Sequence, residues 1–414
     1  MPDRFGLRAM LAVGGAVVAA ATVAVPGAAA AGSPQAIGGS QLSGHGVVVD
    51  YGSGRSRPGL PGVKASAFVI ADAGTGQVLA AKDPHGWYRP ASTLKVLTAV
   101  ALIPLLNPDA TVVASKQATS VPANVVGLIT GHAYRISDLF TALLTISAND
   151  AAVALTQATG SFGQGMAAIN AEARHLQADD TVAVQPNGLD APGQRTSAYD
   201  LALIARQALR QPAFMKYDQT IAAKFSVSAK KSVTLFNQNS LLTSYPGGIG
   251  GKIGWTSAAD ATYVGMARRN GVTLIVTLLH CPALTEIDTA KTLLNWGFAV
   301  DGKVPGVGTL VSALGVGTAA GSPASASAVA SASASAVASA SASASASAVA
   351  SASAVASAGA GGHGARAAGG GSGLVASNPS VLAAGFSCVA LIAAGIGFAY
   401  NRRQRPSARN RRGA

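Results

Sequence analysis

A serine and a lysine stand three residues apart in the segment Ser92-Thr93-Leu94-Lys95. The residues from Ser92 to Ile103 are apolar on nearly all sides of a helix, which predicts a helix buried inside a domain. Residues three apart share one helix face, so the hydroxyl and the amine can meet across a turn. A neutral lysine can take the serine proton where burial and a nearby cation lower its pKa. The pair alone is a weak signal for nucleophilic catalysis, and an N-capping serine with a solvated lysine is the alternative, although this lysine lies on a helix that is apolar nearly all round.

Two further clusters carry polar chemistry. Ser147-Ala148-Asn149 lies between two predicted helices, where Asn149 or Asp150 could also simply cap the second helix. The other cluster is 250–256, a glycine-rich strand with one cation. A phosphate-binding loop is excluded there because Pro246 replaces the first glycine and Ile253 replaces the metal-binding Ser or Thr. A dinucleotide-binding fingerprint is excluded as well, because Ile253 stands where its third glycine is needed. Glycines on an edge strand instead let a substrate backbone come close.

The composition indicates unlike segments joined in one chain. Of 414 residues, 49% are hydrophobic and 11% are charged, against roughly 25% charged residues in a typical globular domain. A mean hydropathy of +0.36 excludes an acidic or polyampholyte disordered chain. The many long charge-free runs of a polytopic membrane protein are also missing. Two cysteines cannot form a disulfide framework or a four-cysteine zinc site, and we assign no role to Cys281.

The two ends of the sequence predict export and anchoring. Residues 1–31 combine two arginines, an apolar run and small residues, as in a signal peptide, although an N-terminal anchor is the alternative. Residues 379–400 include twenty uncharged residues from Val381 to Tyr400, a length that spans about 30 Å as a helix. Residues 401–414 carry six arginines, and positive residues stay on the cytoplasmic side. We expect a single-pass cell-membrane protein with an extracytoplasmic domain and a cytoplasmic tail.

The net charge of +13 follows the same segmentation. Six positive charges belong to the tail and one each to the leader and to Arg366, which leaves +5 for residues 32–365. Such a mild charge is ordinary beside an anionic membrane or wall and gives no reason to expect a nucleic-acid partner.

The interior divides into three parts. Residues 32–64 form a flexible lead-in rich in Gly, Ser and Pro, and residues 301–378 an Ala/Ser/Gly-rich spacer that cannot bury a core. A helical or silk-like stack is the alternative for the spacer. Residues 65–300 are long enough for one domain with a real core.

The pattern of this domain predicts a mixed α/β fold, with an antiparallel sheet flanked by helices and a helical insertion. Strands are expected at 67–71 and 78–81 around a turn, and later at 249–255, 263–268 and 272–279. The last two are joined by Asn270-Gly271, a strong hairpin signal. Helical periodicity covers the segments between them, namely 136–144, 151–159, 165–176 and 198–209, and also 285–296. Strands at both ends must therefore meet in one sheet.

Taken together and in order, the three clusters resemble the S-x-x-K, S-x-N and K-T-G motifs of the serine penicillin-recognising enzymes. Within that superfamily the chain most resembles the low-molecular-weight penicillin-binding proteins of the D-alanyl-D-alanine carboxypeptidase family. The resemblance covers about 65–299. Further segments support it: 88–92, 147–152, 187–190, 197–202 and 250–252. It implies a β-lactamase/transpeptidase-like domain, while 197–200 reads as a capping box that opens a helix.

The resemblance also implies the roles of single residues. Ser92 is the expected acylated nucleophile, Lys95 its base, and Ser147 the relay of a proton toward the leaving amine. The substrate-binding residues are expected to be Asn149, Lys252, Gly254, Trp255 and Thr256, with the amides of Ser92 and Trp255 as oxyanion hole. The implied substrate is a peptidoglycan stem peptide that loses its terminal D-Ala, and β-lactam antibiotics are the implied covalent inhibitors. No metal or organic cofactor is implied.

Ile253 departs from the pattern because it stands where the family has the threonine of K-T-G. The resemblance implies that this hydroxyl binds the terminal carboxylate of the donor peptide. A hydrogen bond to a charged group is worth about 1.5–3 kcal/mol, so we expect weakened but not absent activity. Thr256 lies three residues further along the strand, and we expect its side chain on the opposite face.

Two other functions share the motifs. A β-lactamase needs a deacylating carboxylate, and the two glutamates of the chain, Glu172 and Glu286, do not stand in the matching pattern. A catalytically impaired wall-binding or scaffold homologue is the second alternative, motivated by Ile253. A Ser-His-Asp hydrolase is disfavoured, because no G-x-S-x-G elbow is present and the six histidines are scattered.

Overall fold

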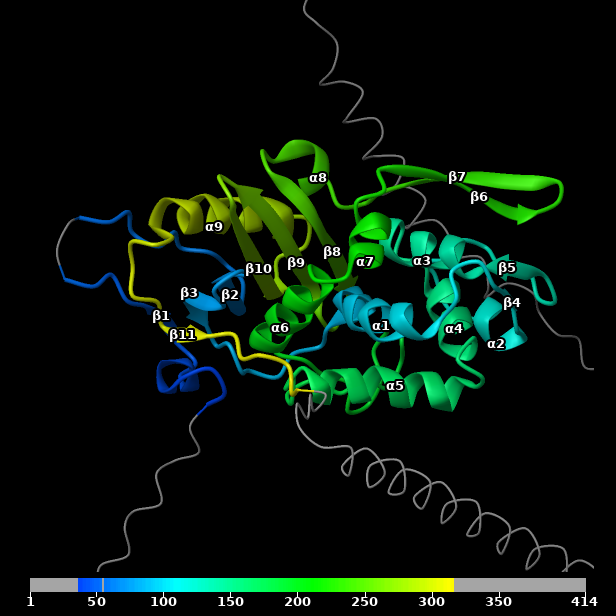
Figure 1. Ribbon diagram of the computed structural model, residues 1–414, viewed down its shortest axis with the longest axis horizontal. Coiled ribbons are helices and arrows are strands. Elements are labelled where there is room, and N and C mark those ends of the chain that lie inside the picture. The colour runs from blue at the N-terminus through cyan, green and yellow to red at the C-terminus, as the bar shows by residue number, and fades with distance from the viewer. Residues whose placement is uncertain (1–35, 54–55, 316–414) are drawn as a thin grey trace, which may run out of the picture. The chain divides into compact units, whose positions relative to one another are not determined.

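The computed structural model describes residues 36–53 and 56–315 (Figure 1). The predicted signal peptide, the membrane helix, the basic tail and most of the spacer lie outside these residues. Within the described ranges, no helix combines the length and the apolar character that crossing a bilayer requires.

An antiparallel sheet of seven strands is the scaffold, in the order β1-β3-β2-β10-β9-β8, with β11 paired to β3. The strands are β1 (Val47–Val49), β2 (Ala67–Asp72), β3 (Gln77–Lys82), β8 (Gly248–Thr256), β9 (Asp260–Arg269), β10 (Val272–Cys281) and β11 (Gly308–Thr309). The first predicted hairpin is β2–β3, and the second, β9–β10, turns at Asn270 and Gly271 with the positive φ angles of a tight hairpin. Pairing of β2 with β10 confirms that distant segments close the sheet, and β8 is left at its edge.

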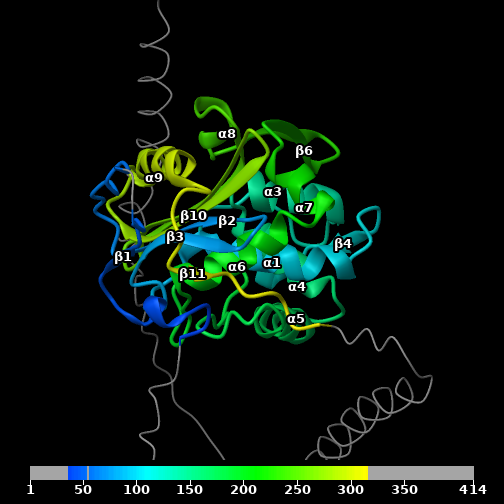
Figure 2. The same cartoon turned by 60° about the vertical axis from the view of Figure 1, so that its left-hand side comes forward.

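Helices cover both faces of this sheet. The longer ones are α1 (Leu94–Leu102), α3 (Ile136–Thr145), α4 (Asn149–Gln157), α5 (Phe162–His175), α6 (Ala198–Ala208) and α9 (Glu286–Val300). The short ones are α2 (Lys116–Thr119), α7 (Pro212–Asp218), α8 (Leu241–Ser244) and the 3₁₀ turns η1 (Ser40–Ser43), η2 (Ala91–Thr93) and η3 (Ile103–Leu105). Figures 1 and 2 show α9 on one face and α6 with α1 on the other. The fold is thus the predicted mixed α/β arrangement with a helical insertion.

All five helices expected from periodicity are present, each within three or four residues of its predicted bounds. One half of the predicted capping box is confirmed, because Ser197 Oγ accepts from the Asp200 amide at 3.1 Å where α6 begins, whereas the Asp200 carboxylate accepts from Thr181 Oγ1 at 2.7 Å. Two small two-stranded sheets lie outside the prediction, β4–β5 (Thr111–Val113, Ala133–Arg135) and the hairpin β6–β7 (Ala222–Ser228, Lys231–Phe236). Their strands are short or largely exposed, so they lack the apolar pattern that identifies a strand.

The sheet also includes residues that the sequence pattern did not assign to the domain. Within the expected lead-in, β1 pairs with β3 over Val47–Val49. Beyond residue 300, β11 pairs with β3, and Val307 and Leu310 are buried in the core. Short apolar stretches among Gly and Pro gave no sign of this, because each is only two or three residues long.

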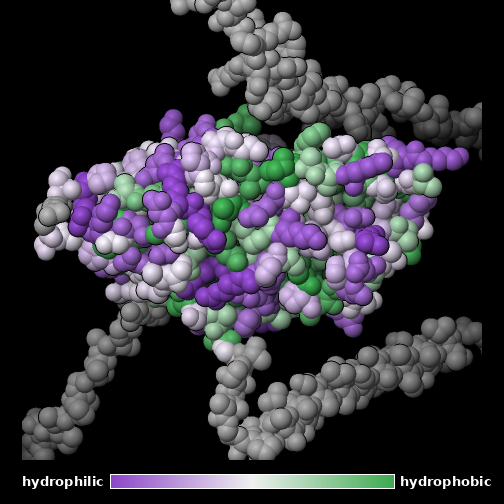
Figure 3. Space-filling model, turned by 45° about the horizontal axis from the view of Figure 1, so that its top comes forward, coloured by the Kyte–Doolittle hydropathy of each residue, from purple (hydrophilic) through white to green (hydrophobic). Residues whose placement is uncertain are grey.

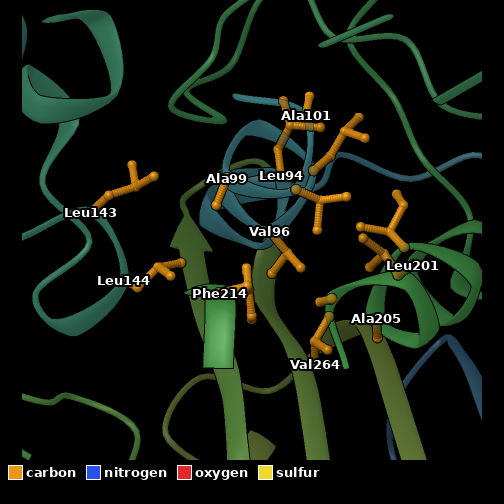
Figure 4. Packing of buried hydrophobic residues seen from close by; sticks show 14 of the residues in the cluster. Leu94, Val96, Ala99, Ala101, Leu143, Leu144, Leu201, Ala205, Phe214 and Val264 are labelled. Carbon is orange, nitrogen blue, oxygen red and sulfur yellow. The ribbon is translucent and has the colours of Figure 1, made fainter. Parts of the chain in front are cut away.

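Helix α1 is the centre of the core. All nine of its residues are buried, as the apolar pattern around the whole helix predicted. Figure 4 shows Leu94, Val96 and Ala99 of α1 surrounded by side chains of other elements. These neighbours are Leu143 and Leu144 of α3, Leu201 and Ala205 of α6, Phe214 of α7 and Val264 of β9. A second cluster packs between the opposite sheet face and α9.

Replacing a central leucine of α1 should therefore cost far more than replacing one just beyond it. Leu97 is 0% exposed and Leu105 in η3 is 59% exposed. We expect Leu97→Ala to lower the free energy of unfolding by about 2–5 kcal/mol, from lost burial and a residual cavity. Leu105→Ala should stay within about 0.5 kcal/mol of the original protein. Urea unfolding of both variants measures the difference, and equal losses would contradict this packing.

Candidate active site

Ser92 lies in η2, the tight turn that leads directly into α1. Two threonine hydroxyls fasten this turn through the Pro90 carbonyl, which accepts from Thr93 Oγ1 at 2.5 Å and from Thr262 Oγ1 at 2.8 Å. Thr262 belongs to β9, so the serine turn is tied to the sheet. Ala91, just before Ser92, has a φ of +46°, a conformation that costs energy for a residue with a side chain. The serine is therefore held in a fixed and partly strained turn.

Lys95 places its amine at the centre of the site. Its Nζ lies 2.8 Å from Ser92 Oγ, 2.7 Å from Asn149 Oδ1 and 2.6 Å from the Asn187 carbonyl oxygen. The side chain is 0% exposed. Burial lowers the pKa of Lys95 well below its ordinary value, the charge of Lys252 lowers it further, and Asp150 partly offsets both. The amine is therefore poised to lose its charge.

The three contacts fit a neutral amine. Such an amine has two N–H donors and one lone pair, and two of its neighbours, the Asn149 and Asn187 oxygens, can only accept. When both donors are used on these oxygens, the lone pair is left for the third neighbour, the hydroxyl of Ser92. The geometry thus directs the serine proton toward Lys95, as a general base requires.

Ser147 and Asn149 come from the turn between α3 and α4. Asn149 is held on both sides of its amide, because Nδ2 donates to the Pro122 carbonyl at 3.0 Å while Oδ1 faces Lys95. Ser147 has a φ of +63°, is 5% exposed, and its Oγ has no hydrogen-bond partner in the described part of the chain. An unpaired buried hydroxyl in a strained conformation is unfavourable by itself, so this serine is suited to an incoming partner.

Asp150 contributes a structural function that the sequence left open. Its carboxylate accepts from the amides of Val126, Gly127 and Leu128 at 2.9–3.0 Å. It also accepts from the Ala151 amide of its own helix at 2.9 Å. The N-cap of α4 is Ala148 and carries no side-chain cap, so the alternative in which Asn149 or Asp150 caps the helix is wrong; Asp150 lies in the first turn and fixes the loop beside Asn149.

Lys252 lies on the edge strand β8 and is 2% exposed. Burial lowers its pKa to about 8, while the charge of Asp218 acts in the opposite direction. Its Nζ donates to the Ile253 carbonyl at 2.9 Å and makes no other hydrogen bond within residues 36–53 and 56–315. An ammonium has three donors, so two remain available to a ligand.

Two glycines allow the backbone to close around Ser92. A Cβ atom on Gly254 of β8 would lie 2.6 Å from the Ser92 amide nitrogen and 2.9 Å from that of Thr93. A Cβ on Gly188, whose φ is +82°, would collide with the Ala91 carbonyl. Only glycine fits at either position, as expected where two backbones approach closely.

The other predicted residues of β8 lie apart from the amine of Lys95. Ile253 packs against the cluster on the α9 face, the face opposite to Lys252. Trp255 is 60% exposed beside Gly254. Thr256 ends the strand, and its Oγ1 accepts from the Ala259 amide at 3.0 Å, so its hydroxyl closes the turn to β9. On the face shown in Figure 3, several hydrophobic patches lie near the middle among hydrophilic residues.

Sequence reasoning missed one direct neighbour of the amine. Asn187 was noted as part of the resemblance but was given no role, although its carbonyl is the nearest of the three oxygens to Lys95 Nζ. The contact is made by a backbone atom, which no side-chain motif reveals. The following Gly188 was the available signal, because a glycine that must approach another backbone marks a close contact.

A serine and a lysine one turn apart, enclosed by a mixed α/β domain, define a serine-type acyl-transfer site. Comparison of the chain with known protein families and solved structures agrees with this class. The family described as D-alanyl-D-alanine carboxypeptidase, peptidase family S11, matches residues 54–282, and the chain belongs to this family of serine-type hydrolases.

Known relatives are similar over the domain. D-alanyl-D-alanine carboxypeptidase DacB2 of Mycobacterium tuberculosis is 38% identical over 248 residues, which are 58% of this chain and 85% of that protein. A crystal structure of a penicillin-binding protein homologue from M. tuberculosis matches with a TM-score of 0.59 at 36% identity, over 64% of this chain and 100% of that one. A variant of the Streptomyces K15 DD-transpeptidase matches with a TM-score of 0.55 at 27% identity, over 58% of this chain and 99% of that one.

The contact between Gly254 and the serine turn can be tested directly. We expect Gly254→Ala to push β8 away from Ser92 and to slow acylation on the order of 100-fold, the effect of misplacing reacting groups by about 1 Å. Gly46→Ala is the control, because a Cβ there meets nothing within 4 Å. Stopped-flow acylation by a chromogenic β-lactam gives the rate constants. An unchanged rate in Gly254→Ala would contradict the close approach.

Proposed function

We propose that this protein is a D-alanyl-D-alanine carboxypeptidase that removes the terminal D-Ala from peptidoglycan stem pentapeptides through an acyl-enzyme on Ser92. The observation that carries the proposal is the buried amine of Lys95, which lies within hydrogen-bond distance of two carbonyl oxygens and of Ser92 Oγ.

Acylation begins when Ser92 Oγ attacks the carbonyl of the penultimate D-Ala and its proton passes to Lys95 Nζ. The developing oxyanion would bind the amides of Ser92 and Trp255. The close approach of Gly254 to the Ser92 amide supports this assignment, because it places the β8 backbone next to the nucleophile. The C–N bond then breaks, and the leaving amine of D-Ala must receive a proton.

Ser147 is the proposed relay for that proton. Its buried Oγ has no partner in the described residues, so it can bind the leaving amine without breaking an existing hydrogen bond. Asn149 would orient the acyl side of the peptide with its amide group. Water then hydrolyses the ester and releases the tetrapeptide.

Lys252 is the proposed site for the terminal carboxylate of the donor. Two of its donors have no partner in the described residues, and it faces the same side of β8 as Gly254. Penicillins also carry a carboxylate beside their reactive amide, so we propose that they acylate Ser92 in the same way. A fast β-lactamase is disfavoured, because Glu172 is engaged with His175 at 3.0 Å and Glu286 begins the distant helix α9.

We further propose that the enzyme acts outside the cytoplasm, anchored to the cell membrane by one helix. The support is the sequence alone: the apolar leader, the uncharged segment 381–400 and the arginines that follow it. The Ala/Ser/Gly-rich spacer would give the domain reach toward the wall.

Release of D-Ala is the decisive test. The purified protein should release D-Ala from a stem pentapeptide and become covalently labelled by a fluorescent penicillin. Ser92→Ala should lose both, with an unchanged circular dichroism spectrum as control for folding. If the original protein is not labelled and releases no D-Ala, the scaffold function is favoured. Rapid turnover of the penicillin would favour a β-lactamase.

Ile253 packs toward α9 but is only half-buried on the edge strand β8, so a hydroxyl at this position could still reach a ligand bound along that edge, and its absence should limit the rate. We expect Ile253→Thr to raise the acylation rate constant about tenfold or more, the equivalent of about 1.5–3 kcal/mol for a hydrogen bond to a charged group. Ile249→Thr makes the same chemical change elsewhere on β8 and should not raise it. No gain in Ile253→Thr would show that this position does not weaken the enzyme.

A further inference from the structure

Asp218, the last residue of α7, is a buried charged group that the proposed mechanism does not use. Its side chain is 0% exposed. One carboxylate oxygen, Oδ2, accepts from the Gly251 amide at 2.7 Å, and the other, Oδ1, has no hydrogen-bond partner in the described part of the chain. The carboxylate therefore contacts β8 one residue before Lys252.

The surroundings of Asp218 are shaped to this carboxylate. A Cβ atom on Gly250 would collide with Asp218 Oδ2, and a register shift interrupts the β8–β9 pairing between Gly248 and Gly250. The backbone of Asp218 is also fixed, because its carbonyl accepts from Asn237 Nδ2 at 2.8 Å. The strand thus bends around a side chain that comes from a different element.

A buried charge requires compensation, and the charged group next to Asp218 is Lys252. Burial raises the pKa of Asp218 to about 7, while the Gly251 amide and the charge of Lys252 lower it. Asp218 in turn favours the charged form of Lys252. The effect is mutual, as linkage between two interacting sites demands.

The other groups around this pair do not replace Asp218. The charge of Lys252 lowers the pKa of Lys95 on α1, and Asp150 on α4 raises it. Burial and the charge of Asp218 raise the pKa of Tyr263 on β9 well above the ordinary value, and its hydroxyl donates to Asn239 Oδ1 at 2.7 Å.

We propose that Asp218 is a positioning residue that keeps Lys252 in its ammonium form and holds β8 at the bend beside it. This inference rests on the proposed function, in which Lys252 binds the terminal carboxylate of the donor. An uncharged Lys252 would attract that carboxylate less, and would also repel a proton on Lys95 less. One carboxylate outside the motifs thereby supports both lysines.

The charge of Lys252 can be followed without reference to activity. An NMR titration of protein labelled with ¹³C at lysine Cε gives the pKa of each lysine. The resonance that disappears in Lys252→Met is assigned to Lys252. We expect Asp218→Asn to lower the pKa measured for Lys252 by about one unit or more, the usual effect of removing an opposite charge within 4–6 Å. The matched control is Asp200→Asn, which neutralises another buried carboxylate with a pKa of about 7, on α6 and without influence on Lys252. An unchanged Lys252 titration in Asp218→Asn overturns the inference.

The acylation rate then connects this charge to function. In a plot of acylation rate against pH, the fall on the alkaline side should move to lower pH by about one unit in Asp218→Asn and stay in place in Asp200→Asn. A merely structural contact would instead lower the rate equally at every pH. Absence of acylation in the original protein overturns the proposed function only, because the NMR titration still decides the role of Asp218. Should Asp218→Asn not fold, Lys252→Met must raise the pKa of the Asp218 carboxyl, and an unchanged value overturns the inference.

Discussion

The buried amine of Lys95 makes no hydrogen bond or ion pair with a carboxylate of residues 36–53 and 56–315, and the rest of the site depends on this constraint. An ammonium in that position would have only the partial compensation of Asp150, with which it forms no ion pair, and would face the charge of Lys252. The surroundings offer two carbonyl oxygens instead, which satisfy the donors of a neutral amine and leave its lone pair for Ser92. The chemistry of the site thus depends on exclusion of water from α1.

That exclusion explains why the groups around Lys95 come from distant parts of the chain. Ser92 precedes α1, Asn149 begins α4, and Asn187 lies in the loop before α6. Each is supported by a rigid element, and the serine turn is fastened to β9 through Thr262. Side chains held by packed helices and strands keep the reacting atoms aligned, which loops alone would do less well.

The sequence predicted the main elements well, because their signals are long and periodic. The fully apolar α1, the strands β8 to β10 and the Asn-Gly turn are examples. Short elements such as β1 and β11 were missed, because two or three residues carry no period. Within the site, S-x-x-K and S-x-N identified residues that the structure brings together at Lys95. The sequence spacing could not predict two other contacts, because both depend on tertiary packing. One is made by the backbone of Asn187, and the other by Asp218, which lies outside every motif.

Two lysines within one site must be kept in opposite charge states, and this is where Asp218 becomes important. The same low-dielectric surroundings that favour neutral Lys95 also disfavour the charge on Lys252. A carboxylate beside one lysine and carbonyl oxygens beside the other separate the two. In the proposed mechanism, attraction of the substrate carboxylate depends more heavily on Lys252, because Ile253 offers no hydroxyl. With Ile at the position of the K-T-G threonine, the proposed mechanism relies more on a buried carboxylate that keeps Lys252 charged.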